Sequence, residues 1–414
     1  MNKKNCIVAQ SGGPTVAINS SLAGVIKGVT VSSSYDKIYG SVNGILGILE
    51  NRIMNLSDFA DEGSDTLSTL MHTPAMYLGS CRFKLPADFS DTDVYETIFA
   101  KFEELNIGAF FYIGGNDSMD TVLKLSAYAK EIQSDVKVIG VPKTIDNDLT
   151  NIDHTPGFGS AAKYIATSLL ESSHDTFIYA TKSVTIVEIM GRDAGWLTAA
   201  SVLARNSYNK APHLIYLPET AFDKEQFLSD VADLLKVHDN VIVAISEGIH
   251  DKDGNYVSAT EAASDTFGHS QLSGAGKTLE YLIKDRLSVK VRSVEINVLQ
   301  RSASHLASQT DLDEAFSLGE TAVRLAEEGI TASMATLKRE SNHPYSVSYG
   351  HAPIAGIANE ARMVPREWIN EAGNDVLSPL VEYLQPLILG EPPIRYENGL
   401  PKYMDVSHLS LTSK

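Results

Sequence analysis

The sequence predicts an α/β protein with two lobes, each a mostly parallel β-sheet covered by helices. The first observation behind this prediction is length: the chain has 414 residues, of which 43% are hydrophobic, and this is more than one ordinary core accommodates. The second is an alternation of short β-rich runs with segments of helical periodicity, which is typical of parallel sheets joined by helical crossovers. Right-handed crossovers are expected between the parallel strands.

The first predicted strand, Cys6–Gln10, leads through a glycine-rich turn into a helical stretch, Thr15–Gly28. A second apolar run, Ala109–Ile113, is followed by helical periodicity from Asp117 to Ile132. Further strands are predicted at Val136–Val141, Val184–Ile189, Leu214–Leu217 and Val241–Ile245. The segment after Met334 is less regular and rich in proline, so we expect it to wrap or cap the core.

Composition excludes several classes of protein. The net charge of −18 disfavours a general nucleic-acid binder, which would be expected to carry a basic excess. No apolar run is long enough to cross a bilayer, and the segment 1–10 lacks the pattern of a signal peptide. The two cysteines, Cys6 and Cys81, have no metal-type spacing and suit reduced thiols in a cytoplasmic protein. An anionic substrate remains compatible with the acidic surface, because local arginines, lysines and helix N-termini reverse the field in a cleft.

Glycine-rich turns follow two of the predicted strands, at the strand ends where α/β proteins bind ligands. In the segment 11–15, Ser-Gly-Gly-Pro-Thr, Gly12 and Gly13 would let backbone N–H groups approach an anion, although a simple tight turn explains the pattern equally well. In the segment 114–118, Gly-Gly-Asn-Asp-Ser, Asp117 alone would be interpreted as a helix N-cap. The two preceding glycines favour a phosphate or metal site there.

Charged residues follow two more of the strands. The segment 142–148, Pro-Lys-Thr-Ile-Asp-Asn-Asp, places Asp146 and Asp148 on the same side of an extended loop. One carboxylate would act as a general base and the other would hold Mg²⁺ or orient its neighbour, whereas a solvated Asn/Asp turn leaves Lys143 unexplained. In the segment 190–196, Arg192 flanked by glycines suits a phosphoryl clamp, with a surface pair to Asp193 as the alternative.

Four other motifs fail. Gly274-Ala275-Gly276-Lys277-Thr278 resembles the end of a Walker A loop, but Gln271 stands where that loop needs its first glycine. The segment 251–255 has Tyr256 where a calcium-binding loop needs glycine, so a hairpin turn is the better interpretation. The segment 157–159, Gly-Phe-Gly, is too short for a dinucleotide fingerprint, and the 11 histidines form no HExxH pair.

With these motifs in hand, the chain resembles the phosphofructokinase family from the first strand to about residue 330. The most specific match is Pro-Lys-Thr-Ile-Asp-Asn-Asp at 142–148, followed by Met-Gly-Arg at 190–192 and Leu-Gly-Ser-Cys-Arg at 78–82. The resemblance implies an active site in the cleft between two lobes. Residues 1–157 with about 300–349 would form the lobe for the phosphoryl donor. Residues 158–299 with about 350–414 would form the sugar-phosphate lobe and the C-terminal tail.

The resemblance also implies roles for residues that pattern alone would leave at the surface, such as Arg82, Glu247, Arg292 and Arg301. Asp146 would take the proton from the 1-hydroxyl of fructose 6-phosphate, and Arg192 and Lys143 would stabilise the transferring phosphoryl group. The donor phosphates would contact Gly12, Gly13, Arg82, Asp117 and Lys143, and Mg²⁺ would contact Asn116, Asp117 and Asp148. The sugar phosphate would contact Thr144, Asp146, Met190, Gly191, Arg192, Glu247, Arg292 and Arg301.

Two residues indicate pyrophosphate rather than ATP as the donor. ATP-using relatives have Gly-Gly-Asp-Gly-Ser where this chain has Gly-Gly-Asn-Asp-Ser, so Asp117 fills the space of the α-phosphate with negative charge. Two like charges about 4 Å apart repel by roughly 4 kcal/mol at an effective dielectric near 20, which disfavours ATP by about three orders of magnitude. Lys143 replaces a glycine of the ATP users and adds a cation for compact pyrophosphate. Transfer from pyrophosphate would be reversible.

The chain also departs from the family pattern. Asn116 replaces a metal-linked aspartate, Val298 a sugar-binding histidine, and Ser183 an arginine that reaches a neighbouring subunit's substrate. The 6-phosphate pocket is therefore expected to differ, with Lys182 as a candidate, while a homo-oligomer (dimer or tetramer) remains the expectation. The alternatives are an ATP-dependent phosphofructokinase, a kinase of the same fold acting on sedoheptulose 7-phosphate, and an inactive regulatory subunit. The last would predict loss of Asp146 or Arg192, and both are present.

Overall fold

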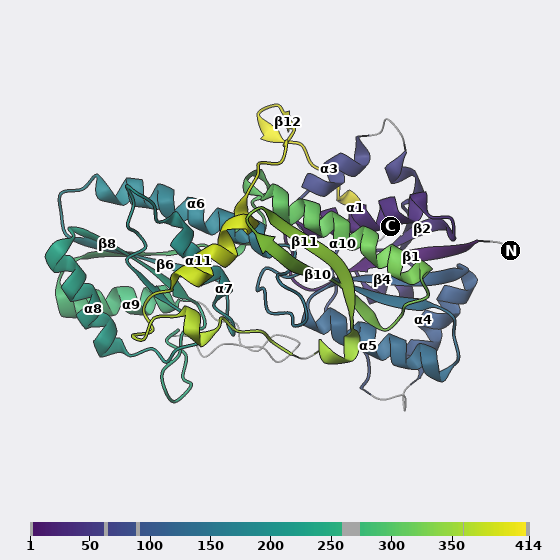
Figure 1. Ribbon diagram of the computed structural model, residues 1–414, viewed down its shortest axis with the longest axis horizontal. Coiled ribbons are helices and arrows are strands. Elements are labelled where there is room, and N and C mark those ends of the chain that lie inside the picture. The colour runs from purple at the N-terminus through teal and green to yellow at the C-terminus, as the bar shows by residue number, and fades with distance from the viewer. Residues whose placement is uncertain (1–2, 62–64, 88–91, 259–273, 359, 411–414) are drawn as a thin grey trace.

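The computed structural model describes residues 3–61, 65–87, 92–258, 274–358 and 360–410. Figure 1 shows two lobes side by side along the long axis of the molecule. The helices in chain order are α1 Ile18–Val31, α2 Ile45–Leu49, α3 Thr66–His72, α4 Asp93–Glu104, α5 Asn116–Glu131, α6 Phe158–Phe177, α7 Trp196–Ala200, α8 Lys224–Val237, α9 Ala275–Leu287, α10 Gln309–Glu327 and α11 Ser378–Leu384. The α/β class predicted from the sequence is confirmed.

The first lobe is built on a sheet with the strand order β11-β10-β5-β4-β1-β2-β3, seven strands within the described residues. Its inner strands are parallel, and antiparallel neighbours close both edges. The strands are β1 Lys4–Gln10, β2 Tyr35–Ser41, β3 Ile53–Asn55, β4 Ile107–Gly114, β5 Lys137–Pro142, β10 Ser333–Asn342 and β11 Tyr345–Pro353. β1, β4 and β5 are almost wholly buried, which explains their continuous apolar sequences.

The second lobe is built on a parallel sheet with the order β7-β8-β6-β9, four strands within the part of the chain that is described. The strands are β6 Ser183–Ile189, β7 Leu214–Tyr216, β8 Asn240–Ser246 and β9 Lys290–Glu295. One apolar cluster includes Phe158, Trp196 and Leu384, and another includes Phe227 and Ile283. The chain enters this lobe through residues 143–157 and returns to the first lobe before α10, and the tail after β11 crosses between the lobes again.

The tail after β11 covers both lobes. Val364, Ile369 and Leu380 are buried in the second lobe with Trp196, and Figure 1 shows α11 lying over the junction. After a short hairpin, β12 Tyr396–Glu397 and β13 Leu400–Pro401, the chain contacts the first lobe, where the main-chain N–H of Met404 donates to Thr73. The tail thus wraps the core, as expected. Its last part does not stay with the second lobe, to which the predicted boundaries assigned residues 350–414.

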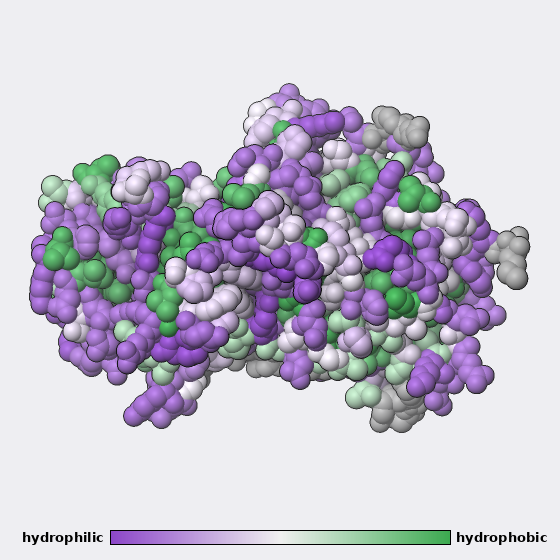
Figure 2. Space-filling view, in the orientation of Figure 1, coloured by the Kyte–Doolittle hydropathy of each residue, from purple (hydrophilic) through white to green (hydrophobic). Residues whose placement is uncertain are grey.

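The face of the molecule in Figure 2 is mainly polar. Figure 2 shows hydrophilic side chains over most of the face in view, with apolar side chains in small separate groups. This agrees with the excess of acidic over basic residues. Among the described residues, no helix is both long enough and apolar enough to cross a bilayer.

Candidate active site

A cavity of about 820 Å³ lies between the lobes, where the carboxyl ends of β1, β4 and β5 face those of β6 and β8. Its walls include Gly12, Gly13, Arg82, Asn116, Asp117, Lys143, Thr144, Asp146, Asp148, Met190, Gly191, Arg192, Glu247 and Arg301. The four motifs that follow predicted strands therefore meet in one place. Strand ends of a parallel sheet lie at one edge, which is why segments distant in sequence converge there.

Positive charge surrounds the turn after β1. The Lys143 Nζ donates to the main-chain oxygen of Gly13 at 2.6 Å, and burial lowers the pKa of Lys143 to about 8. A Cβ atom added at Gly12 would lie 3.4 Å from the same Nζ, and one added at Gly13 would lie 3.4 Å from Nη1 of Arg301. Gly12 has a φ of 80°, a left-handed conformation that favours glycine. Lack of side chains here thus lets the cations approach the backbone of the turn.

Arg301 lies in a 3₁₀ turn, Asn297–Arg301, on the return crossing between the lobes. Burial lowers the pKa of its guanidinium, and its Nε has no hydrogen-bond partner within the described residues. A buried donor without a partner costs free energy, so such a group is expected to gain an anionic ligand. With Lys143, Arg82 and Arg192 on the same walls, the cavity suits a multiply charged anion.

The loop after β5 brings a buried carboxyl group among these cations. Burial raises the pKa of Asp146, while the hydrogen bond from Thr144 and the charges of Lys143, Arg192 and Arg301 oppose the rise. The Thr144 hydroxyl lies 3.3 Å from Oδ2 of Asp146 and accepts from its main-chain N–H at 3.1 Å. A buried carboxylate with a raised pKa is a better proton acceptor than one in water, and this suits a general base.

Asn116 and Asp148 form a pair that could hold a metal ion. The Asn116 Nδ2 donates to Oδ2 of Asp148 at 3.0 Å, so the amide oxygen of Asn116 is turned away from Asp148. This oxygen is buried and has no hydrogen-bond partner among the described residues. Burial and the charge of Asp146 raise the pKa of Asp148 to about 7. In the same range of residues no group of three His, Cys, Asp or Glu side chains could hold a metal. Mg²⁺ suits this sparse oxygen set, because it usually keeps waters and substrate phosphates as ligands.

Asp117 is not the N-cap of α5, which was the simpler interpretation of its position. Gly115 is the N-cap, and Asp117 lies in the first helical turn with its side chain on the cavity wall. A carboxylate there interacts favourably with the helix dipole, but it also opposes any phosphate that approaches the same helix end. The position therefore restricts which anion fits.

The second lobe supplies the wall opposite Asp146. Gly191 has a φ of 135°, and a Cβ atom there would lie 2.7 Å from the main-chain oxygen of Ala194, so the loop needs glycine. The Gly191 N–H donates to Glu247 at 3.3 Å, and burial raises the pKa of Glu247 to about 7. Arg192 does pair with Asp193, at 2.9 Å, but it does so on the cavity wall.

Arg292 is not on this wall, and its expected place in the site is wrong for a single chain. It is paired with Thr185 in the amino-terminal half of β6, whereas the cavity lies beyond the carboxyl end of that strand. Its guanidinium donates to Thr185, Asp175 and Thr176. The strand register therefore places Arg292 beside a small depression that Ser183 and Lys290 also line. Lys182, the candidate for the 6-phosphate, donates instead to the main-chain oxygen of Leu235.

Sequence reasoning missed the contribution of the tail. Glu360 and Ala361 line the cavity together with residues of both lobes. No motif marks them, because they lie in an irregular segment far along the chain. Ser80, which donates to the main-chain oxygen of Gly12 at 2.9 Å, was within the recognised motif at 78–82 but was not singled out.

The rejected motifs have structural roles. Main-chain N–H groups of Gly274 and Gly276 at the start of α9 donate to the carboxylate of Glu188, so a protein side chain occupies the position of a phosphate. Asp251 accepts main-chain hydrogen bonds from Asp253 and Asn255 in a hairpin turn, as predicted. Gln271 lies outside the described residues.

Comparison with known proteins identifies the family. The family model described as Phosphofructokinase matches residues 5–326. The chain belongs to the phosphofructokinase family. It is 41% identical over 405 residues to a curated protein from Halomonas elongata named pyrophosphate--fructose 6-phosphate 1-phosphotransferase, covering 97% of this chain and 96% of that protein. It is also 32% identical to a sulfofructose kinase from Alkalicoccus urumqiensis, covering 91% of this chain and 95% of that protein.

A solved phosphofructokinase supports the fold. The crystal structure of a pyrophosphate-dependent phosphofructokinase from Marinobacter aquaeolei matches with a TM-score of 0.87 and 37% identity, covering 99% of this chain and 98% of that one. The agreement extends over the tail, beyond the residues that the phosphofructokinase family model matches.

Proposed function

We propose that this phosphofructokinase transfers a phosphoryl group from pyrophosphate to the 1-hydroxyl of fructose 6-phosphate, giving fructose 1,6-bisphosphate and phosphate. The observation that carries the donor assignment is that a buried cation and a carboxylate line the same cavity: Lys143 reaches the turn after β1, and Asp117 stands in the first turn of α5. Lys143 attracts a compact diphosphate. Asp117 repels the α-phosphate of a nucleotide by roughly 4 kcal/mol at about 4 Å. The name of the Halomonas relative supports the same donor and acceptor.

In the proposed mechanism the protein positions the two substrates and neutralises charge. Gly12, Gly13 and Arg82 bind the donor phosphates beside Lys143. Asp146 accepts the proton of the sugar 1-hydroxyl, and Thr144 orients the carboxylate. Arg192 and Lys143 stabilise the negative charge that spreads over the transferring group. Met190, Gly191 and Glu247 of the second lobe hold the sugar phosphate together with Arg301, which lies on the return crossing between the lobes.

Magnesium is the proposed cofactor. Asn116, Asp117 and Asp148 would hold the ion, and their oxygen atoms suit it. When bound, Mg²⁺ supplies positive charge to the donor phosphates. The neutral amide of Asn116 brings less charge than the aspartate of the ATP users, so the ion depends more on Asp117 and Asp148.

A role for Arg292 in sugar-phosphate binding requires a second subunit, because within one chain its guanidinium lies at the other half of the sheet. We therefore keep the proposal of a homo-oligomer, in which Arg292 approaches the cavity of a neighbouring chain. A cytoplasmic location fits substrates that occur inside cells and two free buried cysteines.

The proposed reaction is tested by ³¹P NMR of the protein mixed with pyrophosphate, fructose 6-phosphate and Mg²⁺. Loss of the pyrophosphate signal together with equal growth of inorganic phosphate and a new sugar 1-phosphate signal is the expected result. Parallel samples containing ATP, or sedoheptulose 7-phosphate in place of the hexose, test the alternatives. Turnover with ATP alone would overturn the donor assignment, and turnover of the heptose alone would overturn the acceptor assignment.

A further inference from the structure

Residues 360–364 of the tail, called the strap below, cross the junction between the lobes beside the cavity. Glu360 and Ala361 line the cavity itself. The next residue, Arg362, is partly buried, and its guanidinium lies over the ring of Trp196 at 4.8 Å. Val364 is buried in the second lobe. The strap thus touches both halves of the proposed site.

The side chain of Arg362 holds the loop that carries the proposed base. Nη1 donates to the main-chain oxygens of Ile152 at 3.0 Å and Asp153 at 2.5 Å, and Nη2 donates to that of Asn147 at 3.1 Å. The main-chain N–H of Arg362 donates to the oxygen of Asp148 at 2.7 Å. The planar fork of one guanidinium therefore fixes both arms of the loop between Asn147 and Asp153.

Asn147 is also held by the tail. It separates the two carboxyl residues of the motif and has a φ of 55°, a left-handed conformation that asparagine adopts more readily than most residues other than glycine. Its Oδ1 accepts from the N–H of Thr155 at 3.0 Å, and its Nδ2 donates to the hydroxyl of Tyr383 at 2.9 Å. That hydroxyl donates in turn to the oxygen of Asp153, and it also accepts from Arg362 at 3.3 Å. Two residues of the tail thus hold the backbone that directly follows Asp146.

The main chain of the strap is attached to the opposite lobe. The Trp196 Nε1 donates to the oxygen of Arg362 at 2.9 Å. The N–H of Val364 donates to Glu219 at 2.9 Å, and the same carboxylate oxygen accepts from the N–H of Gly195 at 2.8 Å. Gly195 and Trp196 directly follow the loop that carries Arg192. The strap therefore connects the loop of the base to the loop of the phosphoryl-stabilising arginine.

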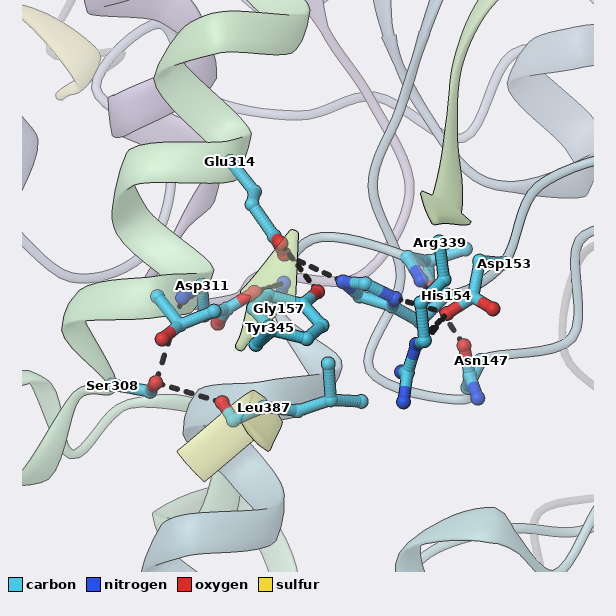
Figure 3. Close-up of polar contacts among 12 residues, drawn as sticks. Asn147, Asp153, His154, Gly157, Ser308, Asp311, Glu314, Arg339, Tyr345 and Leu387 are labelled. Atoms are coloured by element: carbon cyan, nitrogen blue, oxygen red, sulfur yellow. Dashed lines mark hydrogen bonds and ion pairs between the residues drawn. The ribbon is translucent and has the colours of Figure 1, made fainter. Parts of the chain in front are cut away.

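The far end of the base loop has a separate anchor, visible in Figure 3. His154 contacts Asp153 at 2.7 Å and, on its other ring nitrogen, Glu314 of α10 at 2.5 Å. Tyr345 donates to the same glutamate. This anchor ties the loop to the first lobe only. The start of the loop packs on the second lobe through Ile145, and the strap adds a second connection from residues 147–153 to that lobe.

We propose that Arg362 is a positioning residue for phosphoryl transfer, which holds Asp146 in line with Arg192 across the two lobes. The inference rests on the proposed function of Asp146 and Arg192. Arg362 acts on the base through the backbone of the loop. Removal of its side chain leaves the main-chain bonds of the strap in place. It removes the support of residues 147–153 together with the contacts to the Trp196 ring and the Tyr383 hydroxyl.

The test is a comparison of Arg362→Ala with a matched control, Arg366→Ala. Arg366 also donates to three main-chain oxygens, those of Ile369, Asn370 and Glu371, but all lie within the tail and away from the cavity. Arg362→Ala is expected to lower kcat about 10- to 100-fold, because small misplacements of a reacting group have effects of this size. KM for fructose 6-phosphate is expected to stay within about 3-fold of the native value, since the contacts that bind the ground state and the transition state equally are retained. Arg366→Ala should leave both constants near those of the native enzyme.

Two further measurements separate positioning from loss of folding. Arg362→Lys and added guanidinium ion should each restore part of the kcat lost in Arg362→Ala, and guanidinium should leave Arg366→Ala unaffected. Tyr383→Phe is expected to lower kcat less than Arg362→Ala. The fold-loss of kcat in the double variant should be smaller than the product of the two single losses, because both residues hold the same loop. Equal loss of kcat in the two alanine variants, or an unchanged kcat in Arg362→Ala, would overturn the proposal.

Amide hydrogen exchange tests the inference without relying on activity. Arg362→Ala should speed exchange in residues 144–155, whereas Arg366→Ala should speed exchange only around residues 369–371. If native protein lacks turnover with pyrophosphate, the proposed function fails while faster exchange still supports the role of the strap in holding the loop. Unchanged exchange in residues 144–155 would contradict that role whatever the activity.

Discussion

His154 is a buried imidazole between two carboxylates, and replacing it with glutamine is expected to change how stability depends on pH. Burial lowers the pKa of His154, but the charge of Glu314 and the hydrogen bonds with both carboxylates outweigh burial and raise the pKa from 6.5 to about 9. The folded protein thus binds this proton more tightly than the unfolded chain does. The resulting stabilisation is complete below pH 6.5 and is lost as pH rises through about 9. A shift of this size corresponds to about 3 kcal/mol.

The assay is urea unfolding of the native protein and His154→Gln between about pH 6 and pH 9.5. At the acid end the variant should be less stable by about 3–5 kcal/mol, because it leaves buried carboxylates without their cation. The difference should shrink by about 3 kcal/mol toward the alkaline end. His213→Gln is the control: burial lowers the pKa of His213 to about 4, so its removal should not change the alkaline slope. A difference between native protein and His154→Gln that is constant with pH would refute the assignment of a charged His154.

Three predictions concern the proposed reaction. Asp146→Asn should lower kcat by about 10²- to 10⁴-fold with little change in KM, which steady-state kinetics measures; a kcat within a few-fold of native would exclude Asp146 as the base. Arg301→Met should raise KM for fructose 6-phosphate by about 10- to 100-fold, the loss expected for one charge-assisted hydrogen bond, and unchanged KM would place the sugar phosphate elsewhere. Asn116→Asp should lower the Mg²⁺ concentration that gives half-maximal rate and Asn116→Ala should raise it, whereas no response in either would remove Asn116 from the metal site.

Strands with a continuous apolar run were predictable from the sequence, whereas the inner strands β2 and β10 and the edge strands β3, β9 and β11 were missed. The strands β1, β4, β5, β6, β7 and β8 all appear where apolar runs predicted them, within two residues at each end. β9 was missed because it is an edge strand whose side chains are mostly exposed, so Lys-Val-Arg-Ser-Val-Glu shows no apolar run. β11 alternates between exposed and half-buried residues and was likewise not recognised within the proline-rich tail.

The candidate site was predictable where it follows strand ends, because parallel topology brings such ends together. Lys143 and Asp146 are two such residues, because both follow the end of β5. Arg292 shows the limit of motif matching, since its position along β9 decides which half of the sheet it reaches. Arg362 shows a second limit: it follows no strand and belongs to no motif, and its partners between Asn147 and Asp153 lie about two hundred residues away in sequence. Such long-range contacts leave no local periodicity in the sequence.

The choice of donor is the central claim, and it is tested most directly by measuring kcat/KM for pyrophosphate and for ATP in the native protein and in the double variant Asp117→Gly, Lys143→Gly. The native protein should use pyrophosphate in strong preference to ATP, by about three orders of magnitude if the roughly 4 kcal/mol repulsion from Asp117 is fully expressed. The double variant should lose much of its activity with pyrophosphate and gain activity with ATP. Efficient use of ATP by the native protein, or a donor preference that the double variant leaves unchanged, would contradict the account.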